Sequence, residues 1–327
     1  MRFTRFVAVA ALALAGVAAG TAGVNAQGKP AFAGSGIPRY QHIFVVMMEN
    51  HSYGEIIGNP LLPTINALAQ TYGLATNYYG VTHPSEPNYV ASIGGDYFGI
   101  QDDAPYYDHT IAAPSLASQL EGAGMTWKTY QQALPYPGYT GTRWPTSGPV
   151  LYASKHNPFL NFADIQNNPA ELQKIVPDTQ LATDLQIGQV PNFSYIVPDQ
   201  CHDMHGTTGC ASDAVNFPAG DAYVGQTVNL IMGSRAWTQG NNAIVVTWDE
   251  DDFSATNLGC CDANPGGGHV ATIVIANHGP RAVQYGGPAN HYSLLQSIQD
   301  AFHLGCLRYT CDTANVQPLT RLFVPTG

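Results

Sequence analysis

The stretch HIFVVMMENHS at residues 42–52 decides how the chain is read, because an apolar run ends abruptly in a carboxylate, a carboxamide and a histidine. A second stretch, AIVVTWDEDD at residues 243–252, repeats the pattern with four acidic residues in a row. Apolar runs rich in β-branched residues, with little polar alternation, are typical of strands covered by helices on both faces of a sheet. Since ligands of open α/β sheets bind beyond the carboxyl ends of the strands, both polar endings are candidates for one site.

Outward from these two runs, apolar segments alternate with helical patterns along the chain. We expect strands at residues 42–48, 74–79, 126–130, 193–197, 243–248 and 271–276. We expect helices at residues 61–72, 87–93, 115–122, 178–187, 219–232 and 292–302. This alternation predicts an α/β fold, a three-layer α/β/α sandwich with a mainly parallel central sheet.

Length and composition indicate one large domain at 39–327, preceded by a Gly- and Pro-rich lead-in at 27–38. Disorder is excluded because 45% of the residues are hydrophobic and only 11% are charged. The net charge of -11 argues against nucleic acid as a partner, since binding a phosphate backbone needs a basic surface. It does not exclude small anionic substrates, because a metal ion and local dipoles can reverse the potential inside a cleft.

The N-terminus has the three-part layout of a secretory signal peptide. Arg2 and Arg5 are followed by an apolar run at 6–20 and a small-residue segment at 21–26. A membrane anchor is the alternative, but the apolar run is shorter than the roughly 20 residues that a span needs. We therefore expect residues 1–26 to be removed and the mature chain to be secreted, either periplasmic or extracellular, without stable membrane insertion.

All six cysteines lie beyond residue 200. An even number in an exported chain favours disulfides over a zinc-thiolate site, which is the rival interpretation. Cys306 and Cys311 are close enough in sequence to close a small loop. The other four allow two bridges between the segments that carry His202 and Asp249, although pairing cannot be read from sequence; they are Cys201, Cys210, Cys260 and Cys261.

Two pairs of oxygen-bearing side chains follow the two defining strands. Glu49 and Asn50 offer hard oxygen ligands for a divalent cation, although a turn with Asn50 as a helix cap is the alternative. Asp249 and Glu250 head an acidic run whose charges repel one another without a cation, and Lys and Arg are few. The alternative there is a solvated acidic loop. Four oxygen donors favour Mg, Ca or Mn, whereas added histidines favour Zn.

The segment HPSEPNY at 83–89 offers a hydroxyl at a helix start. Pro87 suits the first turn of a helix, and Ser85 just before it lies at the positive end of the helix dipole. We interpret Ser85 as a nucleophile that a metal would activate, with Asn88 hydrogen-bonding a phosphate oxygen. A plain N-cap is the alternative role for Ser85.

Histidines gather after other predicted strands. The loop PDQCHDMHG at 198–206 carries His202 and His205, which suit leaving-group protonation, phosphate contacts or a second metal. His269 follows three glycines, and His291 lies at a helix start. Three further histidines are weaker candidates: His51, His83 and His278.

Residues 130–161 are rich in Pro, Gly and Tyr and show no clean period. This segment is either an insertion over the site that shapes specificity or an ordinary surface loop.

Six motifs in order resemble a known family. They are ENHSYGEIIGNP (49–60), HPSEPNYVASIGG (83–95), PDQCHDMHG (198–206), TWDEDD (247–252), GGGHVATIVIANHG (266–279) and NHYSLLQSIQDAF (290–302). The chain resembles the bacterial and fungal phosphoesterase family of non-haemolytic phospholipases C and acid phosphatases, relatives of the alkaline phosphatase superfamily. The resemblance runs from about residue 41 to 304.

The resemblance implies an alkaline-phosphatase-like fold and hydrolysis of phosphate esters through a seryl-phosphate. It implies Ser85 as nucleophile and Asn88 as a phosphate contact. The implied metal ligands are Glu49, Asn50, Asp249 and Glu250. Four histidines match active-site or nearby positions, among which we assign His269 to the metal: His202, His205, His269 and His291.

We therefore expect a secreted metal-dependent phosphatase of phosphate monoesters. Phospholipase C relatives are usually longer than this chain, and they often carry a twin-arginine leader that its N-terminus does not show. Both differences favour the acid-phosphatase-like branch. A phospholipase C-type diesterase acting on phosphocholine lipids is the nearest alternative, and a non-catalytic metal-binding protein is another. A sulfatase is disfavoured, because the motif Cys-x-Pro-x-Arg is missing. Expected partners are a phosphate-ester small molecule or a phospholipid headgroup, with no obligate protein partner.

Overall fold

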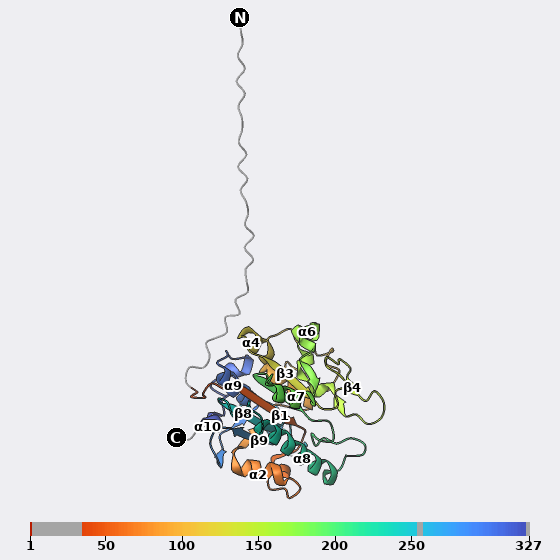
Figure 1. Cartoon of the computed structure of the whole chain (residues 1–327), viewed down its shortest axis with the longest axis vertical. Helices are drawn as coiled ribbons and strands as arrows, with labels where there is room; N and C mark the ends of the chain where they lie inside the picture. The colour runs from red at the N-terminus through yellow and green to blue at the C-terminus, as the bar shows by residue number, and fades with distance from the viewer. Residues whose placement is uncertain (2–34, 254–257, 325–327) are drawn as a thin grey trace.

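The structure is a computed structural model that describes residues 1, 35–253 and 258–324 (Figure 1). Apart from Met1, the expected signal peptide lies outside the described residues, as does the first part of the lead-in. One large cluster of buried apolar side chains runs from Ile37 to Phe323 and forms the core. No helix in the described part of the chain is both long and apolar enough to cross a bilayer.

A nine-stranded sheet organises the molecule, in the order β10-β2-β9-β8-β1-β7-β3-β6 with β11 paired to β2. Its strands are β1 (His42–Met48), β2 (Gly73–Tyr79), β3 (Trp127–Gln131), β6 (Ile175–Pro177), β7 (Phe193–Val197), β8 (Asn242–Trp248), β9 (His269–Ala276), β10 (Val283–Tyr285) and β11 (Ala289–Asn290). All neighbours in this sheet pair in parallel except β9, which is antiparallel to both β2 and β8. The predicted mainly parallel sheet is confirmed.

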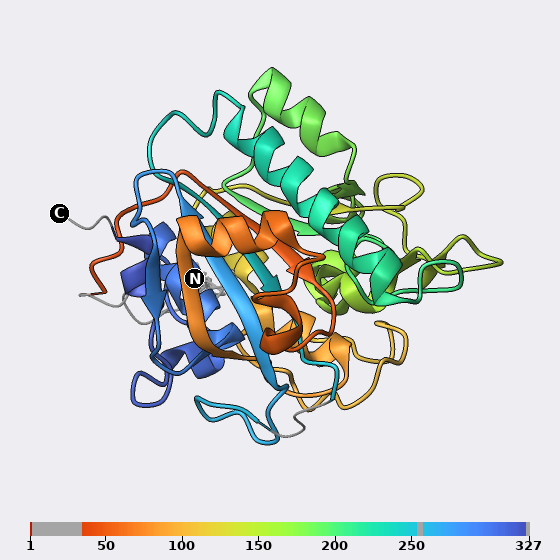
Figure 2. The ribbon, with the colours of Figure 1, turned by 90° about the horizontal axis from the view of Figure 1, so that it is seen from below.

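Helices cover both faces of the sheet. Figure 1 shows α4 and α9 on one side of the strands and α2 and α8 on the other, and Figure 2 shows α2 and α8 together in front of the sheet. The helices of seven residues or more are α2 (Pro63–Thr71), α3 (Ser85–Gly94), α4 (Leu116–Gly122), α7 (Gln180–Ile187), α8 (Asp213–Met232) and α9 (His291–Phe302). Covered faces explain why β1 and β8 are apolar along their length, since nearly every residue in them is buried.

Shorter elements complete the chain. The four-residue helices are α1 (Tyr53–Ile56), α5 (Ala163–Gln166), α6 (Pro169–Leu172) and α10 (Thr320–Phe323). A small hairpin of β4 (Arg143–Trp144) and β5 (Tyr152–Ala153) and the 3-10 turns η1 (Ser154–His156), η2 (Pro158–Asn161) and η3 (Arg308–Cys311) fill the connections. The segment without a clean period therefore contains a hairpin and ends in two successive turns.

Most boundaries of the predicted strands and helices lie within two residues of the observed ones, and two helix starts need comment. Helix α3 begins at Ser85, two residues before the predicted start. Pro87 fits as the third residue of the helix because amide groups in the first turn need no partner within the helix. Helix α8 begins at Asp213, six residues before the predicted start, and accommodates Pro218 near its N-terminal end. The first change matters for function, because it makes Ser85 part of the helix.

The predicted disulfides are present, and the structure decides the pairing that the sequence left open. Cys306 and Cys311 are bonded, as expected. Cys201 pairs with Cys210, and Cys260 pairs with its neighbour Cys261, so neither bridge links the two segments. The Cα atoms of Cys201 and Cys210 are 5.6 Å apart, within bridging range, so that loop closes on itself. With all six cysteines bonded, the zinc-thiolate interpretation is excluded.

Candidate active site

Strand register brings the two acidic strand ends together. Strands β1 and β8 are parallel neighbours in which Met48 pairs with Trp248. The next residues, Glu49 and Asp249, therefore leave the sheet side by side, and the amide of Asp249 donates to the carbonyl of Met48 at 3.1 Å. On the other flank of β1, the amide of Glu49 donates to the carbonyl of Asp203 at 2.8 Å. The carboxyl ends of β8, β1 and β7 thus form one acidic edge.

Ser85 lies at this edge, at the first residue of α3. Its hydroxyl oxygen is 3.1 Å from Oε2 of Glu49 and 3.1 Å from Oε1 of Glu250. A hydroxyl has one proton, so it can donate to only one of these carboxylates at a time. The structure thus brings Ser85, Glu49 and Glu250 together at this edge, and their predicted roles stay predictions.

Three carboxylates are buried here with little positive charge to balance them. Glu49, Asp249 and Glu250 are each 0–1% exposed, and neither carboxylate oxygen of Asp249 has a hydrogen-bond partner. Burial raises the pKa of Asp249 well above its usual range, and the charges of Glu49 and Glu250 add to the effect. Burial also raises the pKa of Glu250 to about 7, although His83 opposes the shift. Such a set is stabilised by a cation.

The donor chemistry suits a hard divalent ion, but the ligands are not in a finished shell. Among the described residues, no three His, Cys, Asp or Glu side chains are arranged to hold a metal ion as they stand. Glu49 and Glu250 are instead engaged with the hydroxyl of Ser85. Asn50 follows Glu49 and is only partly buried. Unpartnered carboxylate oxygens on Asp249 and oxygen-only donors fit Mg, Ca or Mn.

His83, a weaker candidate in the sequence, is part of the site. Its Nδ1 is 2.5 Å from Oε2 of Glu250, and its Nε2 is 3.3 Å from Oδ1 of Asp251. Its ring stacks on Phe253 with centroids 4.0 Å apart. Glu250 therefore joins Ser85 on one oxygen to His83 on the other.

Two site residues come from the segment 130–161, and sequence reasoning missed both. In turn η1, the Nζ of Lys155 lies 3.5 Å from Oγ of Ser85 and 2.9 Å from Oδ2 of Asp103. Nε2 of His156 lies 3.0 Å from Oε1 of Glu49. The only sequence signal was a Lys-His pair inside a predicted cover of the site, in a chain with just 12 Lys and Arg residues. Turn η1 of this segment therefore contacts the site.

The neutral form of His156 is fixed by its surroundings. Burial lowers its pKa well below the usual value, and the charge of Lys155 adds to this. The side-chain amide of Gln200 is 3.1 Å from Nδ1, and if its NH₂ group donates there, the ring proton is on Nε2, facing Glu49. The ring stacks on Tyr89 with centroids 4.9 Å apart. His156 therefore packs beside Glu49 in its neutral form.

Asn88 bonds to the backbone of the loop before Ser85. Its Oδ1 accepts from the amides of Val81 and Thr82 at 2.8 and 3.1 Å, and its Nδ2 donates to the carbonyls of Thr82 and Pro84. The side chain is fully buried. Its Nδ2 also lies 3.4 Å from Oε2 of Glu250. Asn88 therefore holds the loop before Ser85 in place and reaches a carboxylate of the site, and its contact with a substrate phosphate stays a prediction.

His291 is likewise a bracing residue here. Its Nε2 donates to the carbonyl of Asp249 at 2.6 Å, and its Nδ1 accepts from the hydroxyl of Tyr78 at 3.0 Å. Both nitrogens are used and the ring is fully buried, so no atom is left for a substrate. Burial lowers the pKa of His291 to about 4. It fixes the backbone at which the acidic run begins.

His269 begins strand β9 instead of preceding it. Its Nε2 donates to the carbonyl of Thr76 at 3.1 Å, and its ring stacks on Tyr53 with centroids 4.5 Å apart. These contacts engage His269 between β2 and α1. The structure does not bring it into contact with the carboxylates around Ser85, unlike the predicted ligands Glu49 and Glu250.

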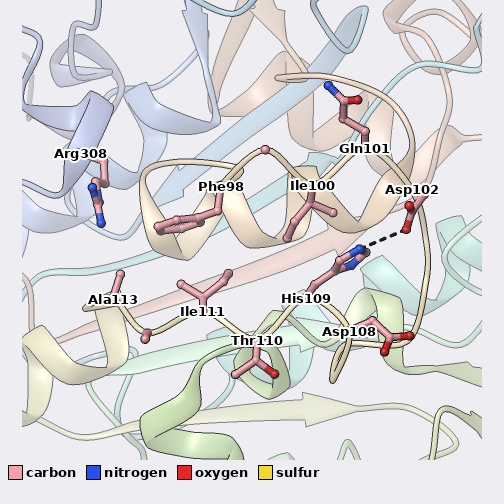
Figure 3. A pocket seen from close by; sticks show the side chains of 12 residues that line it. Phe98, Ile100, Gln101, Asp102, Asp108, His109, Thr110, Ile111, Ala113 and Arg308 are labelled. Atoms are coloured by element: carbon pink, nitrogen blue, oxygen red, sulfur yellow. Dashed lines mark ion pairs between the residues drawn. The ribbon is translucent and has the colours of Figure 1, made fainter.

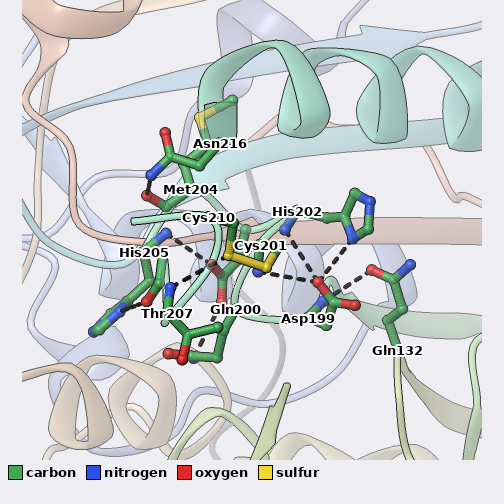
Figure 4. The surroundings of a disulfide bond; sticks show 12 residues. Gln132, Asp199, Gln200, Cys201, His202, Met204, His205, Thr207, Cys210 and Asn216 are labelled. Carbon is green, nitrogen blue, oxygen red and sulfur yellow. Dashed lines mark hydrogen bonds and ion pairs between the residues drawn. A yellow bond between two sulfur atoms is a disulfide. The ribbon is translucent and has the colours of Figure 1, made fainter. Parts of the chain in front are cut away.

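The two histidines of the 198–206 loop point to opposite sides of it (Figure 4). Nδ1 of His202 is 2.7 Å from Oδ1 of Asp199, which raises the pKa of His202 although burial opposes the shift. His205 is exposed, and its ring centroid is 6.2 Å from that of His156. The disulfide between Cys201 and Cys210 closes this loop. His205 therefore lies at the rim of the site, whereas His202 is turned toward Asp199.

A separate cavity of about 620 Å³ opens beside α3 (Figure 3). Its polar end is His109, which lies 3.2 Å from Oδ1 of exposed Asp102 and 3.2 Å from Oε1 of buried Glu86. Glu86 follows Ser85 in α3, so His109 links the polar end of this cavity to the residue next to Ser85.

An α/β sandwich with a serine at a helix start among buried carboxylates defines a hydrolase that acts on phosphoric esters. The chain belongs to the Phosphoesterase family, whose model matches residues 59–305. The matched part contains Ser85, Asp249 and Glu250 but begins after Glu49.

Relatives with curated names are phosphatases. A phosphatidylinositol-3-phosphatase of Mycobacterium tuberculosis is 30% identical over 318 residues, which cover 96% of this chain and 94% of that protein. A probable acid phosphatase of Kluyveromyces lactis is 34% identical over 177 residues, or 52% of this chain and 40% of that protein. The chain thus spans nearly all of the first relative and less than half of the second. These similarities support an acid-phosphatase-like phosphoesterase activity.

Solved structures share the fold. A protein of the alkaline phosphatase superfamily from Vibrio parahaemolyticus superposes with a TM-score of 0.58 and 13% identity, covering 86% of this chain and 71% of that one. A phosphonate monoester hydrolase of Agrobacterium radiobacter gives a TM-score of 0.54 and 12% identity, covering 88% of this chain and 78% of that one. The predicted alkaline-phosphatase-like fold is confirmed.

Proposed function

We propose that the chain is an exported, metal-dependent phosphatase that hydrolyses phosphate monoesters through a seryl-phosphate on Ser85. The observation that carries the proposal is the position of the Ser85 hydroxyl, 3.1 Å from both Glu49 and Glu250 at the first residue of α3. A helix N-terminus attracts an anion, and a neighbouring carboxylate can accept the hydroxyl proton. A nucleophile and an anion-binding position therefore coincide.

In the first step, the Ser85 proton passes to a carboxylate as Oγ forms a bond to phosphorus. The ester P–O bond breaks, its electron pair stays on the leaving oxygen, and that oxygen takes a proton. We assign this proton to His205, because it is exposed at the rim of the site. In the second step, water attacks the seryl-phosphate and gives a proton to His205. The P–Oγ bond breaks, and the carboxylate returns its proton to Oγ, which releases inorganic phosphate and restores the Ser85 hydroxyl.

Glu49, Asn50, Asp249 and Glu250 would hold the divalent ion, which when bound supplies positive charge to the phosphate and to Ser85. The unpartnered oxygens of buried Asp249 support this assignment. His269 was expected among the ligands, and its contacts with Tyr53 and Thr76 favour the four oxygen donors without it.

Acid phosphatase relatives support a monoester as substrate, and the mycobacterial relative widens the class to a phosphorylated lipid headgroup. A phospholipase C-type diesterase is the alternative. The three disulfides support export, since such bonds persist in oxidising compartments.

The test compares turnover of p-nitrophenyl phosphate and p-nitrophenyl phosphorylcholine by the purified protein, from acid to mildly alkaline pH, with and without a chelator. We expect a strong monoester preference that chelation abolishes and added divalent ion restores. Preference for the phosphorylcholine diester would replace the proposal with the diesterase. Full activity after chelation would remove the metal from it.

A further inference from the structure

Lys155 places a cation beside the nucleophile. Its Nζ lies 3.5 Å from Oγ of Ser85 and 2.9 Å from Oδ2 of Asp103, and its side chain is 22% exposed. Burial lowers its pKa, but the charges of Glu49 and Asp103 outweigh burial and raise the pKa above the usual value. Lys155 is therefore a permanent cation, partly open to whatever enters the site.

We propose that Lys155 is a catalytic residue that binds a non-bridging oxygen of the phosphoryl group during attack by Ser85, and that Asp103 positions it. The inference rests on the proposed function, since it requires Ser85 to be the nucleophile. The inference goes beyond the proposed function by naming the side chain that favours a doubly charged phosphate.

The geometry suits this role. An oxygen on the phosphorus that bonds to Oγ would lie within reach of an ammonium group 3.5 Å from Oγ. The ammonium has three donors, of which Asp103 takes one. As the Oγ–P bond forms and the ester P–O bond breaks, the non-bridging oxygens keep their negative charge, and Lys155 keeps all its protons. A fixed charge aimed at these oxygens stabilises the transition state without reorganisation.

The charge balance favours such a cation in addition to the metal ion. A phosphate monoester brings up to two negative charges to an edge that already holds Glu49, Asp249 and Glu250, all buried. A diester brings one. Since Coulomb attraction scales with the product of charges, Lys155 favours the monoester over the diester.

A purely structural ion pair would explain these contacts less well, because both partners are held without it. Turn η1 is fixed by His156, which contacts Glu49 and stacks on Tyr89. Oδ1 of Asp103 accepts the amide of Glu86 at 3.0 Å, independently of Lys155. The backbone on each side therefore stays in place when the Lys155 charge is removed.

The experiment measures Lys155→Met against two references. Lys174→Met is the matched control, because Nζ of Lys174 is also paired, 2.6 Å from both Glu121 and Glu171, but lies outside the site. Ser85→Ala reports the proposed function itself. For each variant, we would measure kcat/KM for p-nitrophenyl phosphate and for bis(p-nitrophenyl) phosphate, and the inhibition constant of inorganic phosphate.

We expect Lys155→Met to lower monoester kcat/KM by about 10²- to 10³-fold, the range for loss of one charge-stabilising donor. Diester kcat/KM should fall by about tenfold or less, and the phosphate inhibition constant should rise by about tenfold or more. Equal losses on both esters with unchanged phosphate inhibition would overturn the proposal in favour of a structural role. If Lys155→Met has near-normal activity while Ser85→Ala is inactive, the role proposed for Lys155 is overturned and the proposed function still holds. Active Ser85→Ala would instead overturn the proposed function.

If circular dichroism shows that Lys155→Met does not fold, the Asp103→Asn variant tests the proposal instead. Its carboxamide oxygen can still accept from the amide of Glu86, while the charge that positions Lys155 is lost. We expect a lower monoester-to-diester ratio and weaker phosphate inhibition. An unchanged ratio and unchanged inhibition would overturn the proposal.

Discussion

Met48 and Trp248 are direct partners in the parallel pair of strands β1 and β8. Each is the last residue of its strand, so the chain turns out of the sheet at the same level on both strands. That register places Glu49 beside Asp249, with the hydroxyl of Ser85 within hydrogen-bond distance of Glu49. The acidic pair is thus a consequence of sheet register between segments far apart in the sequence.

A covalent intermediate on Ser85 is the first prediction. Rapid acid quenching during turnover of p-nitrophenyl phosphate should trap a phosphopeptide that contains Ser85, detectable by mass spectrometry. Ser85→Ala should lose this adduct and about 10³-fold or more in kcat, because the attacking oxygen is gone.

The matched control is Ser92→Ala in the same helix, whose hydroxyl donates to the carbonyl of Tyr89 at 2.7 Å. It should keep the adduct and most of the activity. Phosphate trapped on another residue would contradict the assignment.

The Asp249→Asn substitution should have opposite effects on the melting temperature without and with metal, relative to the wild type. Without metal, the substitution relieves repulsion among buried carboxylates, so the melting temperature should rise by about 2–4 °C for each kcal/mol gained. With a divalent ion at about 100 times its Kd, the wild type should gain about 5–10 °C and the variant far less. Differential scanning fluorimetry with Mg²⁺, Ca²⁺, Mn²⁺ and Zn²⁺ in turn would measure both effects.

Asp221→Asn is the control for that experiment, since Asp221 is also buried but accepts from the amides of Thr64 and Ile65 at the start of α2. It should lower the melting temperature and leave the metal-induced rise unchanged. An undiminished rise in Asp249→Asn would exclude Asp249 as a ligand.

His291 should make the protein sensitive to acid. Burial lowers its pKa to about 4 from an ordinary value of 6.5. The unfolded chain therefore binds a proton at a higher pH than the folded one, so the contribution to stability is complete above about pH 6.5 and is lost as the pH falls through 4. The full difference is about 3 kcal/mol as an order of magnitude.

Urea unfolding of metal-free protein at several pH values would test this. The stability of His291→Gln should fall less between pH 7 and pH 4 than that of the wild type, whereas His278→Gln, on the surface, should follow the wild type. Parallel pH profiles for His291→Gln and the wild type would show that other groups cause the acid sensitivity.

Gly80 should be intolerant of any side chain. A Cβ there would lie 2.7 Å from the carbonyl oxygens of Asp249 and Gly267, both in the backbone. Because neither backbone can move away cheaply, Gly80→Ala should cost about 1–3 kcal/mol and displace the acidic run. Thermal unfolding should show the loss, with reduced kcat for p-nitrophenyl phosphate.

Gly122→Ala in α4 is the comparison, since a Cβ there meets nothing within 4 Å. It should be neutral or slightly stabilising. If Gly80→Ala were as stable and active as Gly122→Ala, the backbone at Asp249 and Gly267 would have to move away from residue 80 at little cost.

Several parts of the site were predictable from local patterns. Glu49 and Asp249 follow runs whose β-branched composition predicted covered strands, and nearly every residue of these strands is buried. Ser85 precedes a proline that suits a first helical turn. By contrast, the roles of Asn88 and His291 were not predictable. Their hydrogen-bond partners are backbone groups of folded loops together with side chains of other elements, Glu250 for Asn88 and Tyr78 for His291.

The sequence by itself determined the alternation of strands and helices, the three-layer fold and the polar residues at its strand ends, because periodicity and turn chemistry act over a few neighbouring residues. Tertiary structure alone decided which of those residues face the nucleophile. It brought Lys155 and His156 from an irregular segment to Ser85 and Glu49, paired the cysteines within their own loops, and turned His202 away. These outcomes depend on sheet register and on which loops pack together, and such long-range contacts leave no periodic trace in the chain.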